Sequence, residues 1–223
     1  MSFHTPSDLK LICGNRNYSS WSLRAWLTLR KAGIDPELIV LPMDTPEFEE
    51  RVAQYSPTRR VPVLWIGDEY VWDSLAIAET VNERYADFAL WPVDLKLRAL
   101  GRAMAAEMHS GFAALRQEMP MNCRARQRRL AVSDGVHRDV HRISELWQAA
   151  QQQSGSSTWL LGDFSIADAM FAPVAVRFGA YALDLSVPTK AYVDHWLADA
   201  DLQAWMSLAN KEAWVIEHEE VGE

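Results

Sequence analysis

The sequence predicts an α/β domain followed by an all-helical domain, with a short linker between them. In the first 85 residues, short apolar runs typical of strands alternate with helical patterns, whereas after Tyr85 only helical patterns recur. The chain has 223 residues, of which 49% are hydrophobic and 23% charged, which is enough for two modest folded domains. We therefore expect an N-terminal domain over residues 1–85, a linker over 86–94 and a helical domain over 95–223.

The predicted N-terminal domain has the element order β-α-β-α-β-β-α. The apolar run 9–13 predicts a buried first strand. Leu23, Trp26 and Leu27 recur at helical spacing and predict a helix, which Gly33 ends. The remaining elements are expected as a strand over 37–41, a helix over 47–54, a hairpin of strands 61–66 and 69–72 around Gly67-Asp68, and a helix over 74–85.

The second half of the chain predicts a set of amphipathic helices. Apolar residues at helical spacing from Leu97 to Leu115 indicate one long helix. Ser165 and Asp168 have the spacing of a capping box at a helix start, a structural role without chemistry. Further helical segments are expected over 136–150, after Asp163 to about Leu183, and in a short region after Pro188. A solvated helix face is expected for the basic cluster Arg124, Arg126, Arg128 and Arg129.

The composition excludes several classes of function. A net charge of −8 argues against a general nucleic-acid binder, because neutralising phosphates needs a surplus of Lys and Arg. The first ten residues lack the apolar stretch of a signal peptide, and no apolar run of about 18 residues predicts a membrane span. Cys13 and Cys123 are the two cysteines, and two distant thiols imply no disulfide framework. We therefore expect a cytoplasmic protein without nucleic-acid or membrane partners.

Val61-Pro62 is the motif that points most directly to a ligand. A proline inside an apparent strand cannot donate a ladder hydrogen bond. One explanation is a cis bond at the start of the strand, which exposes the backbone of Val61 to a ligand. The other is a proline on an edge strand, without a functional role.

Two further motifs lie at predicted helix starts. Asp73 and Ser74 precede the helix over 74–85, where unpaired N–H groups and the positive end of the dipole favour a ligand carboxylate. In this interpretation Ser74 donates to the carboxylate and Asp73 receives an amine; simple N-capping is the alternative. The segment 17–22 begins the first helix, where a hydroxyl is suited to donate to a sulfur and lower the pKa of a thiol. Capping is again the alternative.

In this order and spacing, the motifs resemble the glutathione transferase family over nearly the whole chain, through the segments RVPVL, DSLAIAETV and GDFSIADA. The resemblance implies a thioredoxin-like N-terminal domain that binds glutathione. It also implies an all-helical C-terminal domain that contributes the electrophile site. By resemblance, Val61 pairs its backbone with the cysteinyl part of glutathione beside a cis Pro62, while Asp73 and Ser74 hold the γ-glutamyl end.

The start of the first helix is similar to that of the zeta class of this family. RNYSSWSLRAWL aligns with the Arg-Ser-Ser-Cys-Ser-Trp opening of the class, with Ser20 and Trp21 in common. Asn17 and Tyr18 stand where the class has two serines, and Ser19 stands where it has cysteine. The group expected to hold the thiolate is therefore Ser19 first, followed by Tyr18, Ser20 and Asn17.

The zeta class also carries maleylacetoacetate isomerase activity, which uses an arginine on the helix after the capping box. Pro173 aligns with the class, but Ala180 stands at the arginine position and Arg177 lies three residues earlier. This activity is therefore the least favoured of the functions considered. Glu107 and His109 either line the second-substrate site or lie on an ordinary helix surface, and the helix surface is the expected outcome.

The function that the resemblance implies is a glutathione transferase. In such an enzyme the thiolate of bound glutathione attacks a small hydrophobic electrophile in an apolar cleft beside the C-terminal helices. Glutathione is the co-substrate, no metal or prosthetic group is implied, and a homodimer is expected. The alternative from another class is a non-catalytic protein of the same fold that binds glutathione or a partner.

Overall fold

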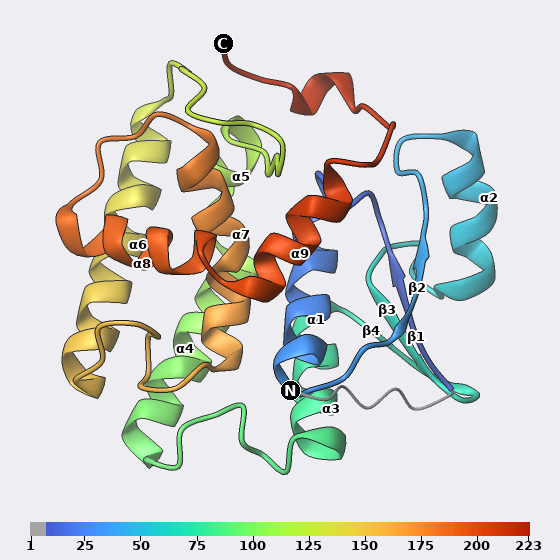
Figure 1. Ribbon diagram of the computed structural model, residues 1–223, viewed down its shortest axis with the longest axis horizontal. Coiled ribbons are helices and arrows are strands. Elements are labelled where there is room, and N and C mark those ends of the chain that lie inside the picture. The colour runs from blue at the N-terminus through green and yellow to red at the C-terminus, as the bar shows by residue number, and fades with distance from the viewer. Residues whose placement is uncertain (1–7) are drawn as a thin grey trace.

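The computed structural model describes residues 8–223, in which a small mixed sheet with three helices packs against a group of further helices (Figure 1). The strands lie in the order β2-β1-β3-β4. β1 and β2 pair in parallel, whereas β3 is antiparallel to both β1 and β4. The strands are β1 (Leu9–Cys13), β2 (Glu37–Val40), β3 (Val63–Ile66) and β4 (Glu69–Trp72). This is the mixed sheet and closing hairpin that the sequence predicts.

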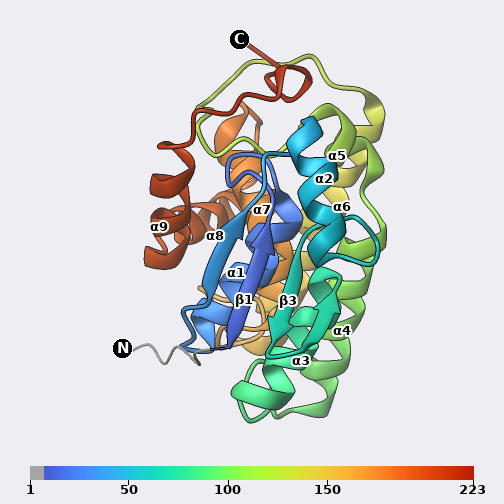
Figure 2. The same cartoon turned by 90° about the vertical axis from the view of Figure 1, so that its right-hand side faces the viewer.

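The helices of the first half are α1 (Ser20–Lys31), α2 (Pro46–Tyr55) and α3 (Ser74–Tyr85). α1 and α3 lie between the sheet and the helical half, and α2 covers the opposite face of the sheet (Figures 1 and 2). Gly33 ends α1 as predicted: its φ is +79°, and the next N–H, of Ile34, donates to the carbonyl of Leu29 at 2.9 Å. Glycine suits this Schellman turn because it has no Cβ to oppose a positive φ.

The helical half is built around α7, which is buried over nearly its whole length and contacts α1, α4 and α8. At its start, the Asp168 carboxylate accepts from the backbone and hydroxyl of Ser165, so the predicted capping box is confirmed. The region after Pro188 holds two helices rather than one short segment. The helices are α4 (Leu95–Ser110), α5 (Ala113–Glu118), α6 (Asp134–Ser154), α7 (Ile166–Ala180), α8 (Val187–Leu197), α9 (Ala200–Ala209) and the 3₁₀ turn η1 (Glu217–Glu219).

The prediction of one long helix from Leu97 to Leu115 is wrong. α4 ends at Ser110, Gly111 is extended, and Phe112 has a φ of +60° before α5 begins. The side chain of Arg116 stabilises the break, since its Nε donates to the carbonyl of Gly111 at 2.9 Å and its Nη2 donates to the carbonyl of Met108. The apolar spacing continues across the break because Phe112 is buried there too.

The prediction that the basic cluster lies on a helix face is also wrong. Residues 119–133 form an irregular segment between α5 and α6. Arg128 donates to the Glu220 carboxylate, and Arg124 donates to the carbonyls of Glu212 and Trp214. Arg124 and Arg128 therefore bind the acidic C-terminal segment, which offers them a carboxylate and backbone carbonyls as acceptors.

The core has two parts. The larger lies between the sheet and the helices of the second half and includes both buried, unbridged cysteines, Cys13 and Cys123. The smaller lies on the other face of the sheet and consists of Ile12, Leu41, Val52 and Val63. Among residues 8–223, no helix has the length and apolar character needed to cross a membrane.

Candidate functional site

A cavity of about 610 Å³ lies where the predicted ligand motifs meet. We call it the first cavity. Its wall includes the residues before β3, the end of β4, the start of α3 and the start of α1, and α4 adds one residue, His109. The lining residues are Trp21, Thr58, Arg60, Val61, Pro62, Trp72, Asp73, Ser74 and His109. The structure thus brings Val61, Asp73 and Ser74 together.

The bond between Val61 and Pro62 is cis, as predicted. β3 begins at Val63, so the missing N–H of Pro62 removes no hydrogen bond from the sheet ladder. Val61 lines the first cavity two residues before the start of β3. The contact of its backbone with a ligand stays a prediction.

Asp73 combines two functions at the start of α3. It is the N-cap residue, with a φ of +75°, and its Oδ1 accepts from the backbone N–H groups of Leu75 at 2.9 Å and Ala76 at 3.3 Å. Its Oδ2 lies 3.1 Å from Nε2 of His109. The next side chain, Ser74, is buried, and its hydroxyl has no hydrogen-bond partner among the described residues. The N-capping role is therefore real, and it leaves one carboxylate oxygen and one hydroxyl for other partners.

A second cavity, of about 320 Å³, adjoins the first and has residues from many segments on its wall. Trp21 and Val61 line both cavities, so the two share a wall. The lining residues of the second cavity are Tyr18, Ser19, Ser20, Trp21, Met43, Val61, Arg116, Pro120, Arg177 and Glu219.

Ser19 is the N-cap residue of α1 and stands at the end of a short chain of hydroxyl groups. The backbone N–H of Gly14 donates to Oγ of Ser22 at 3.0 Å, and the hydroxyls of Ser22 and Ser19 are 2.7 Å apart. When Ser22 donates to Ser19, the proton of Ser19 is left for a group in the second cavity. The neighbouring Ser20 is also buried on this wall.

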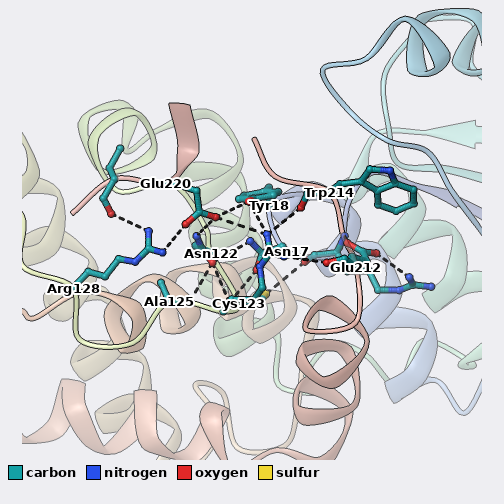
Figure 3. Close-up of polar contacts among 12 residues, drawn as sticks. Asn17, Tyr18, Asn122, Cys123, Ala125, Arg128, Glu212, Trp214 and Glu220 are labelled. Atoms are coloured by element: carbon teal, nitrogen blue, oxygen red, sulfur yellow. Dashed lines mark hydrogen bonds and ion pairs between the residues drawn. The ribbon is translucent and has the colours of Figure 1, made fainter. Parts of the chain in front are cut away.

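The other two candidates for the thiol have their polar groups engaged elsewhere (Figure 3). Asn17 donates to Oδ1 of Asn122 at 3.0 Å and accepts from the backbone N–H of Arg124 at 3.0 Å. The hydroxyl of Tyr18 donates to Glu220 at 2.6 Å and accepts from Arg124 at 2.7 Å. Burial, followed by this bond to Glu220, raises the pKa of Tyr18 above its usual value.

The C-terminal segment 210–223, which we call the strap, closes one side of the second cavity. Glu219 lines the cavity, and the adjacent Glu220 accepts from Asn122 at 2.9 Å and from Arg128 at 2.5 Å (Figure 3). Sequence reasoning missed the strap. The signal that was available is the opposite charge of the basic cluster and the run EHEE over 217–220.

Positive charge gathers on the wall of the second cavity. Arg177 is buried on α7 and donates to the carbonyls of Met119 at 2.7 Å and Pro173 at 3.3 Å. Burial, and next the repulsion from Arg116, lower the pKa of Arg177 to about 10. Within residues 8–223, no carboxylate lies within 4.0 Å of the guanidinium of Arg116 or Arg177. Arg177 thus lines the second cavity, although it lies three residues before position 180, where the zeta class has its arginine.

Trp21 lines both cavities, whereas Glu107 is bound at the surface. The guanidinium carbons of Arg24 and Arg116 lie 4.4 Å and 4.8 Å from the ring centroid of Trp21. Such contacts hold the indole in place between the two cavities. Glu107 instead binds Arg142 on the surface at 2.8 Å, which agrees with the expected helix-surface role. His109 lies in the first cavity and not on an ordinary surface.

Known proteins share both the sequence pattern and the fold. Residues 18–84 match the family described as "Glutathione S-transferase, N-terminal domain". A "Probable maleylacetoacetate isomerase" from Caenorhabditis elegans is 26% identical over 187 residues, which cover 82% of this chain and 86% of that protein. A glutathione transferase homologue from Burkholderia gl BGR1, solved with bound glutathione, superposes with a TM-score of 0.67 at 23% identity and covers 92% of this chain and 99% of its own. A diazinon-metabolizing glutathione S-transferase from the silkworm, Bombyx mori, gives a TM-score of 0.69 at 22% identity, covering 92% and 98%.

Proposed function

We propose that this chain, which belongs to the glutathione S-transferase family, is a glutathione transferase acting on a small hydrophobic electrophile. The observation that carries the proposal is the common wall of the two cavities. One cavity holds groups suited to the γ-glutamyl end of glutathione, and the other holds hydroxyls at a helix start. A tripeptide anchored in the first cavity would present its sulfur at the shared wall, beside Val61 and Trp21.

The first cavity has a group for each charge of the γ-glutamyl end. The Oδ2 of Asp73 suits the ammonium. The unpaired hydroxyl of Ser74 and the N-terminus of α3 suit the carboxylate, since a helix start offers free N–H groups and positive potential. The backbone of Val61, beside the cis Pro62, pairs with the cysteinyl part, as the family resemblance implies.

Ser19 is the residue that we assign to the glutathione thiol. Its hydroxyl belongs to the chain from Gly14 through Ser22, and donation into the cavity would stabilise a thiolate and lower the pKa of the thiol. Ser20, also on the wall, is the second choice. Tyr18 has its hydroxyl held by the strap, so it ranks below both serines.

The proposed reaction is a nucleophilic attack by the bound thiolate. A bond forms between the glutathione sulfur and an electrophilic carbon of the second substrate, and the electron pair leaves with a departing group or is protonated after addition. Met43 and Pro120 supply apolar surface to the second cavity. The rate gain comes from the lowered thiol pKa and from holding both reactants at one wall.

The serine variants test the proposal directly. Ser19→Ala should raise the pKa of the thiol of bound glutathione, which is measured by the absorbance of the thiolate. The variant should also lower kcat/KM for an aryl halide by roughly 10- to 100-fold, which corresponds to the loss of a hydrogen bond to a charged group. Ser20→Ala is the matched control and should change both quantities little. The reverse pattern would move the role to Ser20. Wild-type protein that binds glutathione without turning over any electrophile would favour a non-catalytic binding protein.

A second candidate function is supported by Arg177. Its presence on the wall of the second cavity, together with the 26% identity to isomerase relatives, favours a glutathione-dependent isomerase of a carboxylate-bearing substrate. Arg177→Gln would then abolish cis–trans isomerisation of maleylacetoacetate while leaving conjugation of a neutral aryl halide within about threefold, because the charge is lost while the side-chain amide can still donate to the carbonyl of Met119. Absence of isomerisation by the wild-type protein would end this candidate.

The oligomeric state is proposed on the same family basis. A homodimer is expected, because most soluble oligomers are symmetric and dimers are the commonest among them. The exposed aromatic side chains Tyr70 and Trp72 on the edge strand β4 are candidates for the contact. Sedimentation equilibrium at micromolar concentration would test the expectation, and a monomer mass would refute it.

A further inference from the structure

We propose that His109 is a positioning residue of the glutathione site. From the helical half of the chain it holds the Asp73 carboxylate in the orientation that receives the γ-glutamyl ammonium. The inference rests on the proposed binding of glutathione and adds a residue and a role to it. The sequence interpretation placed His109 on a helix surface or in the second-substrate site, so neither motif nor spacing pointed to this position.

The placement of His109 is what distinguishes it. Every other residue on the wall of the first cavity comes from the first 74 residues, whereas His109 comes from α4. Its Nε2 lies 3.1 Å from Oδ2 of Asp73, and the side chain is 29% exposed. Its ring meets the edge of Trp21 at a centroid distance of 5.2 Å. The imidazole is therefore held between the shared wall of the cavities and the N-cap of α3.

Only one oxygen of the Asp73 carboxylate is available to a ligand, and a partner that orients this oxygen would favour binding. Its Oδ1 is occupied by the backbone N–H groups of Leu75 and Ala76, so Oδ2 is the oxygen available to a ligand. A carboxylate oxygen can accept two hydrogen bonds, so Oδ2 can receive His109 and an ammonium together. Donation by His109 fixes the plane of the carboxylate before the ligand arrives, and a preorganised group binds more tightly.

The tautomer of His109 follows from burial. Nδ1 is buried and has no partner among the described residues. A hydrogen on Nδ1 would be a buried donor without an acceptor, and leaving a buried polar group unpaired is costly. With a hydrogen on Nε2, the ring places its donor 3.1 Å from Oδ2 of Asp73.

The test must separate positioning from a simple clamp between α3 and α4. A glutathione analogue in which a hydrogen replaces the α-amino group makes no contact with Asp73. His109→Ala should raise the Kd for glutathione about tenfold, because Asp73 must then be ordered when the ligand binds, and should leave the Kd for the analogue unchanged. His109→Gln, whose side-chain amide supplies an N–H at a similar reach, should return the Kd for glutathione to within about threefold of wild type.

Calorimetric titration of the full-length chain measures all of these constants. His141→Ala is the matched control, because it removes another histidine that faces a carboxylate, that of Glu145, on the exposed side of α6. An equal loss of affinity for both ligands in His109→Ala would identify a clamp and overturn the inference. An unchanged Kd for glutathione would overturn it as well. Wild-type protein that binds neither ligand would instead refute the proposed function.

Discussion

The two cavities share a wall, yet they are assembled in different ways. The first is built mainly from two short stretches, 58–62 and 72–74, whose residues are neighbours in the sequence. The second draws on the start of α1, on residues near α5, on α7 and on the strap. A site that is local in sequence can be recognised from motifs, whereas a site assembled from distant segments emerges only when the chain has folded.

The cavities also differ in charge. The first places the Asp73 carboxylate at the N-terminus of α3, and this combination suits a ligand end that carries both signs. The second presents the guanidinium groups of Arg116 and Arg177, with Glu219 of the strap nearby. The difference suggests that the first cavity selects one ligand of fixed chemistry, while the second tolerates variation in its lining. Each of the following variants tests whether the two cavities act separately.

The largest effect is expected for Asp73→Asn. Asparagine caps a helix well and tolerates positive φ, so the fold should be preserved, while the charge proposed to receive the γ-glutamyl ammonium is lost. The Kd for glutathione should rise roughly 10- to 100-fold, and the melting temperature should stay close to that of wild type. At saturating glutathione the KM for the electrophile should be unchanged. A rise in that KM would show that the cavities are coupled.

A smaller effect, on both cavities, is expected for Trp21→Leu. The indole forms part of the shared wall and contacts two guanidinium groups, those of Arg24 and Arg116. Loss of these contacts should raise both the Kd for glutathione and the KM for the electrophile by roughly five- to tenfold. Titration calorimetry and steady-state kinetics measure the two quantities. A change in the Kd for glutathione alone would show that Trp21 serves only the first cavity, and a change in the KM for the electrophile alone would show that it serves only the second.

The smallest effect is expected for Glu220→Gln, and it should depend on pH. Burial raises the pKa of Glu220, but the bonds from Tyr18, Arg128 and Asn122 outweigh it, and the pKa is lowered overall. A lowered folded pKa gives stability that is present above the usual glutamate value of about 4.3 and is lost as the pH falls through the folded value. Wild-type protein should therefore lose stability below about pH 4 more steeply than the variant.

Urea unfolding at several pH values measures this difference. At pH 7 the variant should be less stable by about 1 kcal/mol, a value reduced for solvent screening of a partly exposed group. The KM for the electrophile should rise a few-fold because the strap loosens, while the Kd for glutathione stays constant. If the free energy of unfolding depends on pH in the same way in both proteins, the stabilising role of the hydrogen bond between Tyr18 and Glu220 is contradicted.

Elements with local signals could be predicted from the sequence. β1 and α3 have the bounds that the apolar runs indicate, because burial of alternate or 3.6-spaced residues determines them. The cis bond before Pro62 and the cap at Asp73 also rest on neighbouring residues. The motifs that supply most of the first cavity could therefore be recognised from the sequence, whereas His109 reaches the cavity from another helix.

Features that depend on particular polar contacts, near or far along the chain, could not be predicted. The break after Ser110 is stabilised by a side chain six residues later, that of Arg116, while the apolar spacing runs through it unchanged. The role of Tyr18 depends on the strap, about two hundred residues along the chain, and that of Asn17 depends on Asn122, about one hundred residues along the chain. Spacing within a segment contains no information about such partners.

The hydrogen bond between Tyr18 and Glu220 of the strap has a consequence for related sequences. Tyr18 stands in the loop that precedes α1, and its hydroxyl is committed to Glu220 and Arg124, while Asn17 is committed to Asn122. Since these two loop positions bind other segments of the chain, the thiol role that we propose falls to the serines that follow. The five positions should then change together among homologous sequences, and a homologue with serine at position 18 should lack an acidic residue at position 220.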